Sequence, residues 1–384
     1  MQDAVIVDAV RTPGGRRKGK LKDWHPTDLA AHVLKALETR NNLDPEIVDD
    51  VIMGCVMQVG EQSINIGRNA VLAAGWPESV PATTVDRQCG SSQQALHFAA
   101  QGVIAGAYDV VVAAGVEVMT RVPMGASIVE NMGFPFSQTM LDRYADTGLP
   151  PQGIGADMIA DKWGFTRRDL DEFGARSQQL ALKATEEGRF KNEIIPVPIG
   201  EELMDSDEGI RPGTTADTLG KLKPAFSEDG KITAGNSSQI ADGASAALVM
   251  SAEKAKELGL KPRARFHAFA LAGADPVTML TGPIPVTKKI LERTGMKIDD
   301  IDLFEVNEAF ASVVLAWQKE TGADWDRVNV NGGAIALGHP LGCSGTKLMS
   351  TLLNELERTG GRYGLQTMCE GGGMANATII ERLD

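Results

Sequence analysis

The feature that most constrains the fold is a unit of strand, small-residue turn, helix and strand that occurs once in each half of the chain. In the first half, a β-rich run at 80–85 leads to a turn at 89–92, a helical pattern and a strand at 109–115. In the second half, residues 328–330 lead through a glycine-rich stretch to a turn at 342–345, a helix and a strand at 365–369. Alternating strands and helices are typical of α/β folds, and two units of one design indicate an internal duplication.

The length of the chain and the weak periodicity of its middle segment indicate the domain organisation. A chain of 384 residues exceeds the size at which one core stops growing, so we expect at least two lobes. Gly, Pro, Met and acidic residues are frequent from about 119 to 247, yet helical patterns at 156–163 and 169–188 favour an inserted loop domain over a disordered linker. We therefore predict an N-terminal half (1–118), an inserted domain (119–248) and a C-terminal half (249–384).

Bulk composition excludes several classes of protein. The net charge of −13 argues against nonspecific nucleic-acid binding, which requires a basic field. The four cysteines form no CxxC pair and the five histidines are scattered, so we expect neither a disulfide framework nor a zinc site. No apolar run reaches membrane-spanning length, the first residues lack the basic charge of a signal peptide, and the end is no peroxisomal address. We expect a cytoplasmic protein without a membrane span.

Two residues stand out as candidates for chemistry. Cys89 lies between a strand and a helix, where unpaired N–H groups and the helix dipole would lower the thiol pKa toward neutrality and could bind an oxyanion. A small buried core residue is the alternative for such a cysteine. His339 lies in the run Gly338-His339-Pro340-Leu341-Gly342, whose rigid backbone allows close approach to a ligand. A purely structural histidine is the alternative there.

Two further segments could contribute polar groups. Cys369 ends a strand and is followed by Glu370 and three glycines, a sequence suited to an anion-binding nest of N–H groups or to a plain turn between strands. Asn307 and Glu308 follow a strand-like run and could orient a water or a substrate, or could simply cap a helix and fill a buried polar position.

Taken together, these segments resemble the thiolase family. The matching stretches are 8–13, 85–91, 307–310, 331–346 and 369–373, in the order and spacing of the family and covering nearly the whole chain. The resemblance implies an α/β thiolase fold: two βαβαβαββ halves in five layers, α-β-α-β-α, with an inserted loop domain. It also implies a homodimer or homotetramer that acts on coenzyme A thioesters, including acetyl-CoA, with no metal and no permanently bound cofactor.

The resemblance also assigns roles to residues. Cys89 is implied to be the nucleophile that accepts the acyl group, and His339 to deprotonate it and stabilise the thioester oxyanion. Cys369 is implied to exchange the proton at the α-carbon, and Asn307 to hold a water that completes the first oxyanion hole. The N–H groups of Cys89 and Gly371 are implied to form the second. Such chemistry suits a thiol, because the acyl intermediate is itself a thioester that a second thiol can cleave.

Several positions bear on the substrate. Ser238, in Gly235-Asn236-Ser237-Ser238, matches the family serine that contacts the CoA pantetheine. Ser92 and Ala375 replace commoner glycines, with Ser92 expected to crowd the helix start, and Glu370 replaces an aliphatic residue. Gly153 stands where short-chain biosynthetic relatives carry a histidine, which would open the acyl pocket. We therefore expect a degradative 3-ketoacyl-CoA thiolase of fatty acid breakdown or, given the Cys-Glu-Gly-Gly-Gly ending, steroid breakdown.

Three other functions remain open at this stage. A short-chain acetyl-CoA acetyltransferase would use the same residues with a smaller pocket. A ketoacyl synthase of the same fold uses one cysteine with a His/His or His/Asn pair, which the second cysteine disfavours. A non-catalytic lipid-binding relative would lack the nucleophile or the histidine, and this chain keeps both. The basic run Arg16–Lys20 could contact CoA phosphates or a neighbouring subunit, although a solvated loop is the simpler interpretation.

Overall fold

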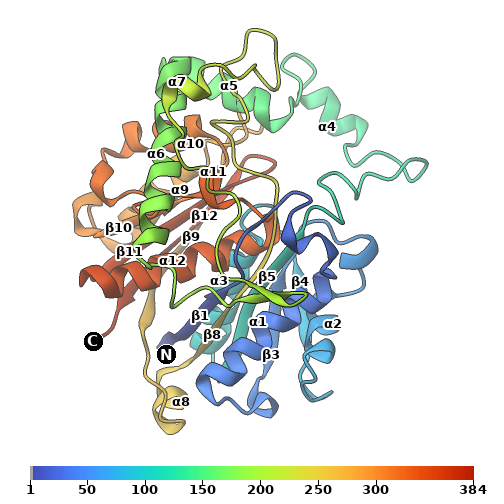
Figure 1. Ribbon diagram of the computed structural model, residues 1–384, viewed down its shortest axis with the longest axis vertical. Coiled ribbons are helices and arrows are strands. Elements are labelled where there is room, and N and C mark those ends of the chain that lie inside the picture. The colour runs from blue at the N-terminus through green and yellow to red at the C-terminus, as the bar shows by residue number, and fades with distance from the viewer. Residues whose placement is uncertain (1–2) are drawn as a thin grey trace.

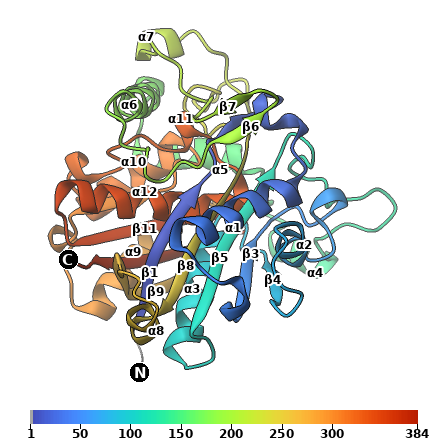
Figure 2. The same ribbon diagram turned by 60° about the horizontal axis from the view of Figure 1, so that its bottom comes forward.

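The computed structural model describes residues 3–384; residues 1 and 2, with which the predicted first half begins, lie outside the described residues. One large sheet runs through the molecule in the order β10-β11-β12-β9-β1-β8-β5-β3-β4, with β2 paired to β8. Figure 2 shows strands of both halves side by side, from β11 at one end to β4 at the other. Within residues 3–384, no helix combines the length and the apolar character needed to cross a membrane.

The predicted strands and helices of both halves are present, except for the strand predicted at 328–330. The elements of the first half are β1 (Ala4–Arg11), β2 (Gly15–Arg16), α1 (Pro26–Asn41), β3 (Asp50–Gly54), α2 (Ile66–Ala73), β4 (Ala82–Val85), α3 (Ser91–Ile104), β5 (Val110–Val118) and β8 (Ala241–Ser251). After α8 (Ala252–Glu257), those of the second half are β9 (Ala264–Gly273), α9 (Pro283–Thr294), β10 (Leu303–Val306), α10 (Ala311–Thr321), α11 (Ala334–Leu337), α12 (Ser344–Thr359), β11 (Tyr363–Glu370) and β12 (Met374–Arg382).

The pairing of the strands confirms the duplication. In the first half β3 is parallel to β5, β5 is antiparallel to β8, and β8 is antiparallel to β1. In the second half β10, β11, β12 and β9 repeat the same order and directions. The counterpart of β4, predicted at 328–330, is reduced to isolated bridges. Asn329 adopts a left-handed φ of 47° there, and its side-chain amide pairs with both backbone groups of Val306 instead.

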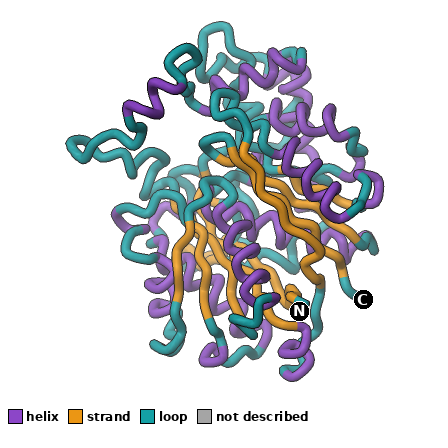
Figure 3. Tube along the Cα trace, turned by 180° about the vertical axis from the view of Figure 1, so that it is seen from behind, coloured by secondary structure: helices purple, strands orange, loops and turns teal. Residues whose placement is uncertain are grey.

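Five layers follow from how the helices cover the sheet. Apolar residues of α1 and α2 pack on the outer face of the first half, and those of α9 and α10 on the outer face of the second. A third core joins α3 and α12, which lie against each other between the strands of the two halves. The two groups of strands meet where β1 pairs with β9, with Val5 opposite Arg265 and Ile6 opposite Ala264. Figure 3 shows the two groups from behind. The predicted α-β-α-β-α order is therefore confirmed.

The middle segment is an ordered insertion between β5 and β8, and its helices lie in the upper part of Figure 1. Its elements are α4 (Gln138–Arg143), α5 (Gln152–Trp163), α6 (Arg167–Glu186), β6 (Val197–Ile199), β7 (Glu202–Met204) and α7 (Ala216–Leu219). Arg11 of β1 anchors it, because its buried guanidinium binds Glu193 at 2.7 Å and both carboxylate oxygens of Asp207. The division into three domains stays a prediction, and its boundary at 248 falls within β8.

Candidate active site

Cys89 lies on a sharp turn between β4 and α3. The turn requires a left-handed residue, Gln88 with φ 49°, whose N–H donates to the Asp86 carboxylate at 2.6 Å. The Ser91 hydroxyl closes the turn by accepting from the Arg87 N–H at 2.9 Å and donating to the Gln88 carbonyl. The sequence expectation of a cysteine at the helix start is confirmed, and only 7% of its surface is exposed.

The expected low pKa of this thiol is wrong. Burial raises the pKa of Cys89 above its ordinary value, and the neighbouring Cys369 and Glu370 raise it further. Its own N–H and that of Gly371 hydrogen-bond toward the sulfur and oppose the rise without cancelling it. Two N–H groups cannot replace the lost hydration of a thiolate in so enclosed a place. The resting group is therefore a thiol, and a base must remove its proton.

His339 is held as a neutral imidazole with one defined tautomer. The Ser344 hydroxyl donates to the Pro340 carbonyl at 2.9 Å and lies 2.5 Å from His339 Nδ1. The Pro340 carbonyl can only accept, so the arrangement that satisfies all three groups has the hydroxyl donating to this carbonyl and accepting from Nδ1–H, which leaves Nε2 unprotonated. Burial, aided by the charge of Lys347, lowers the pKa of His339 to about 3. A free Nε2 lone pair can accept a proton, although a pKa this low makes the resting imidazole a weak base.

Asn307 brings the histidine and the second cysteine together. It follows β10, and its Nδ2 lies 3.5 Å from His339 Nε2 and 4.0 Å from Cys369 Sγ. Cys369 is fully buried in β11, and burial raises the pKa of its thiol to about 12, with Asn307 opposing the rise. Three of the predicted residues therefore meet in one buried constellation, and Cys89 adjoins it through Cys369 and Gly371.

The three glycines after Glu370 form the turn between β11 and β12. Gly372 and Gly373 have positive φ of 81° and 77°, which residues with a side chain rarely adopt. The conformation leaves the Gly371 N–H free to point at the Cys89 sulfur. The run is therefore a strand-to-strand turn that presents one N–H group, that of Gly371, to the candidate nucleophile, and the anion-binding nest stays a prediction.

The positions expected to contact the acyl group and coenzyme A, Gly153 and Ser238, both lie in the insertion. Ser238 is half-buried, and its N–H donates to the Ala309 carbonyl at 2.9 Å, two residues after Asn307. Gly153 does not open a pocket: a Cβ there would collide with the Phe226 ring, which packs edge-on against Phe310 with centroids 5.9 Å apart. The expected widening is wrong because an aromatic side chain from elsewhere in the insertion fills the space.

Ser92 is also better accommodated than expected. A Cβ at Gly115 would collide with the Ser92 Cβ, and one at Gly54 would collide with the Ser92 backbone nitrogen, so Gly115 makes room for the side chain and Gly54 for the backbone. Its hydroxyl accepts from the Thr346 N–H at 3.0 Å and joins the start of α3 to the start of α12.

Sequence reasoning missed three residues that support the site. Ser344 sets the tautomer of His339, and the buried Lys347 donates to the carbonyls of Leu337 and Gly338 just before it. Glu117 of β5 accepts from the Gly342 N–H at 2.9 Å and holds the far side of the same loop. Only Ser344 had a signal in the sequence, a hydroxyl five residues after the histidine; the other two contacts depend on the packing of distant elements.

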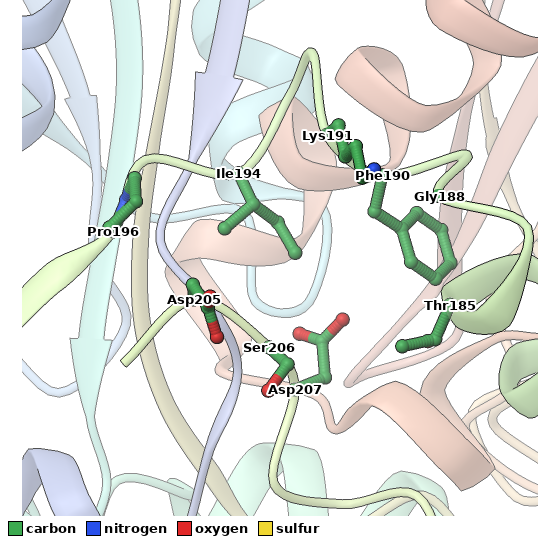
Figure 4. A pocket seen from close by; sticks show the side chains of 9 residues that line it. All are labelled: Thr185, Gly188, Phe190, Lys191, Ile194, Pro196, Asp205, Ser206 and Asp207. Atoms are coloured by element: carbon green, nitrogen blue, oxygen red, sulfur yellow. The ribbon is translucent and has the colours of Figure 1, made fainter. Parts of the chain in front are cut away.

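The cavities differ in their relation to this constellation. A small enclosed cavity of about 10 Å³ lies behind it, bordered by Asn307, Ser344 and Lys347. A more open one of about 420 Å³ lies in the insertion, where Figure 4 shows Phe190, Ile194 and Asp207 around it. Asp207 is bound to Arg11, and this cavity lies apart from Cys89, His339 and Cys369, none of which lines it.

The chain is similar to known proteins over nearly its whole length. The family model of the thiolase N-terminal domain matches residues 4–253, and that of the thiolase C-terminal domain matches residues 260–382. The steroid 3-ketoacyl-CoA thiolase FadA6 of Mycobacterium tuberculosis is 51% identical, with 100% of this chain and 95% of that protein aligned. A 3-ketoacyl-CoA thiolase of Marinobacter nauticus is 47% identical over 100% and 99% of the two chains.

A solved structure gives the same result. The crystal structure of the Bacillus anthracis acetyl-CoA acetyltransferase superposes with a TM-score of 0.91 at 40% identity, covering 100% of this chain and 99% of that one. Identity at this level over whole chains, two matching family models and a shared fold lead to one conclusion. The chain belongs to the thiolase family, a family of acyltransferases that act on coenzyme A thioesters.

Proposed function

We propose that this thiolase cleaves 3-ketoacyl-CoA thioesters in a degradative pathway, through an acyl group carried on Cys89. The observation that carries the proposal is the position of Asn307, whose amide lies within 4.0 Å of both the His339 imidazole and the Cys369 thiol. A base with a free lone pair, an amide donor and a second thiol, together with Cys89, are the groups that a two-step Claisen cleavage requires.

The first step transfers the acyl group. His339 Nε2 takes the Cys89 proton, and the thiolate attacks the 3-keto carbon. The bond between C2 and C3 then breaks, leaving the acyl group on sulfur and an enolate of acetyl-CoA. Cys369 donates its proton to C2, and acetyl-CoA leaves. The N–H groups of Cys89 and Gly371 stabilise the oxyanion on the acyl carbon, while His339 and a water on Asn307 stabilise the enolate.

The second step releases the product. The thiol of coenzyme A gives its proton to the Cys369 thiolate and attacks the acyl carbon on Cys89, and the thioester bond to the protein breaks. The shortened acyl-CoA leaves, and the Cys89 thiolate takes its proton back from His339. The same steps in reverse form a carbon–carbon bond, so relative concentrations decide the direction. Ser238, beside Ala309, contacts the pantetheine arm in this proposal, with the rest of the CoA lying along the insertion of residues 119–248.

The substrate class rests on the relatives. Those at 47–51% identity are named as 3-ketoacyl-CoA or steroid 3-ketoacyl-CoA thiolases, whereas the acetyl-CoA acetyltransferase structure is 40% identical. The alternative is a short-chain enzyme that prefers acetoacetyl-CoA, and the Phe226 ring beside Gly153 favours it by occupying space.

Thiolysis rates with three substrates separate the two functions. We would compare acetoacetyl-CoA, a straight-chain 3-ketoacyl-CoA and a bulky ring-bearing 3-ketoacyl-CoA at equal coenzyme A. A higher kcat/KM for either larger substrate supports the degradative function. A kcat/KM at least about tenfold higher for acetoacetyl-CoA, a difference of about 1.4 kcal/mol in transition-state binding, makes the chain a short-chain acetyltransferase.

We propose further that the enzyme is a cytoplasmic homodimer or homotetramer. The four cysteines are free and buried, which suits a reducing compartment. β4 ends the sheet as an edge strand, and such edges are usually covered in the assembled protein. Light scattering on the purified protein measures the oligomeric state; a monomer at micromolar concentration contradicts it.

A further inference from the structure

Glu370 is a buried carboxylate that the proposed chemistry does not use. It lies between Cys369 and Gly371, and none of its surface is exposed. Two other buried carboxylates, Glu117 and Glu308, each accept hydrogen bonds from backbone and side-chain donors. Among the described residues, neither carboxylate oxygen of Glu370 has a hydrogen-bond partner. A carboxylate left in this way is costly when charged.

The side chain lies directly behind the nucleophile turn. A Cβ at Gly90, the residue after Cys89, would collide with Glu370 Oε1 and with the Asn376 amide. Asn376 Nδ2 donates to the Gly90 carbonyl at 3.0 Å, so the turn, Asn376 and Glu370 form one packed unit. Only a glycine at position 90 permits this approach.

The groups that face the carboxyl are few. Arg87 and Asp86 are the charged neighbours, and the thiols of Cys89 and Cys369 are the other titratable ones. No ion pair joins Arg87 to Glu370 in the described chain, where Arg87 Nε is itself buried without a partner. Burial and Asp86 raise the pKa of Glu370 to about 8 against the opposing charge of Arg87. The carboxyl is therefore neutral below that pH and negative above it.

We propose that Glu370 is a positioning residue whose protonation state controls the ionisation of the Cys89 thiol. A neutral Glu370 permits a thiolate at Cys89, and an ionised Glu370 opposes one. The inference rests on the proposed role of Cys89 as nucleophile. Glu370 packs against Gly90, and no hydrogen-bond donor in the described chain solvates its carboxyl oxygens, so an ionised Glu370 and a Cys89 thiolate repel each other. An aliphatic residue at position 370 would supply the packing and lack this control.

The pH dependence of Cys89 alkylation tests the proposal. The wild type and Glu370→Gln would be treated with iodoacetamide from about pH 6.5 to pH 9.5, with labelling of Cys89 followed by peptide mass spectrometry. Glu253→Gln, an exposed carboxylate on α8, is the control that removes a charge elsewhere. We expect equal rates near pH 6.5 and about tenfold faster alkylation of Glu370→Gln near pH 9, because removal of a close like charge lowers a pKa by about one unit or more.

The outcomes separate a charge effect from a structural one. A constant ratio of the two rates at every pH overturns the proposal, because a disturbed turn would change reactivity without regard to pH. The wild type alone also tests it: the logarithm of the Cys89 rate should rise with a slope below one through about pH 8, and a slope of one contradicts coupling. If substrate places no acyl group on Cys89, the proposed function fails instead, whatever the alkylation rates are.

Discussion

Replacement of Ser344 by alanine isolates the control of the histidine tautomer. In the wild type the hydroxyl accepts from His339 Nδ1–H at 2.5 Å, and it is 2% exposed. Alanine leaves that N–H buried without a partner, a loss of about 1–3 kcal/mol. The proton can then move to Nε2, where it blocks the lone pair that accepts from Cys89. Because the hydroxyl lies behind the ring, the loss falls on catalysis and should lower kcat about 5- to 150-fold with little change in KM.

Steady-state thiolysis measures the effect, and Ser350→Ala supplies a matched control. Ser350 lies on the same helix α12, is fully buried, and its hydroxyl has no partner among the described residues. Its removal creates a similar small cavity without loss of a hydrogen bond. If Ser344→Ala retains kcat within about twofold of the wild type, a difference below about 0.5 kcal/mol, the tautomer argument is refuted. Equal losses in both variants would mean that α12 packing, and not the histidine, governs the rate.

Two further predictions concern stability. Arg11→Met leaves the carboxylates of Asp207 and Glu193 buried without their cation, so urea denaturation should show a loss of about 3–5 kcal/mol; a loss below about 1 kcal/mol contradicts the anchoring role. Burial lowers the pKa of His97 to about 3, so the unfolded chain takes up a proton below about pH 6.5 that the native chain does not. The stability of the wild type relative to His97→Gln should therefore fall by about 1.4 kcal/mol per pH unit from pH 6 to pH 4, and a constant difference refutes the shift.

The fold was predictable from the sequence because helices, strands and turns each leave a local pattern in it. Hydrophobic periodicity marked the helices and strands, and the small-residue turns marked their junctions. The strand expected at 328–330 failed because Asn329 takes a left-handed conformation that its amide hydrogen bonds to Val306 stabilise. The apolar pattern of residues 328–330 does not reveal that the Asn329 side chain forms the hydrogen bonds that a strand backbone would form.

The sequence predicted which residues form the site, but it did not predict the protonation state of Cys89. Cys89, Asn307, His339 and Cys369 were identified from short motifs, and the last three meet as expected. The pKa of Cys89 was predicted in the wrong direction, because the helix-end argument is local and the burial that outweighs it depends on the complete fold.

The prediction that Gly153 widens the acyl pocket failed for a related reason. The space that a glycine leaves is open only if no distant residue fills it, and Phe226 lies 73 positions further along the chain. Ser344 and Lys347 act on His339 through contacts that only the folded loop creates. Long-range packing therefore limited what could be predicted of the pocket and of the residues behind the imidazole.

The most direct test of the central claim is the mass of the Cys89 peptide after brief exposure to acetyl-CoA or a 3-ketoacyl-CoA. Acylation of that peptide alone is expected, with loss of the label when coenzyme A is added and with none in Cys89→Ser. An acyl group on Cys369 or Cys343 instead, or thiolysis that continues in Cys89→Ser, would contradict the assignment of Cys89 as the nucleophile.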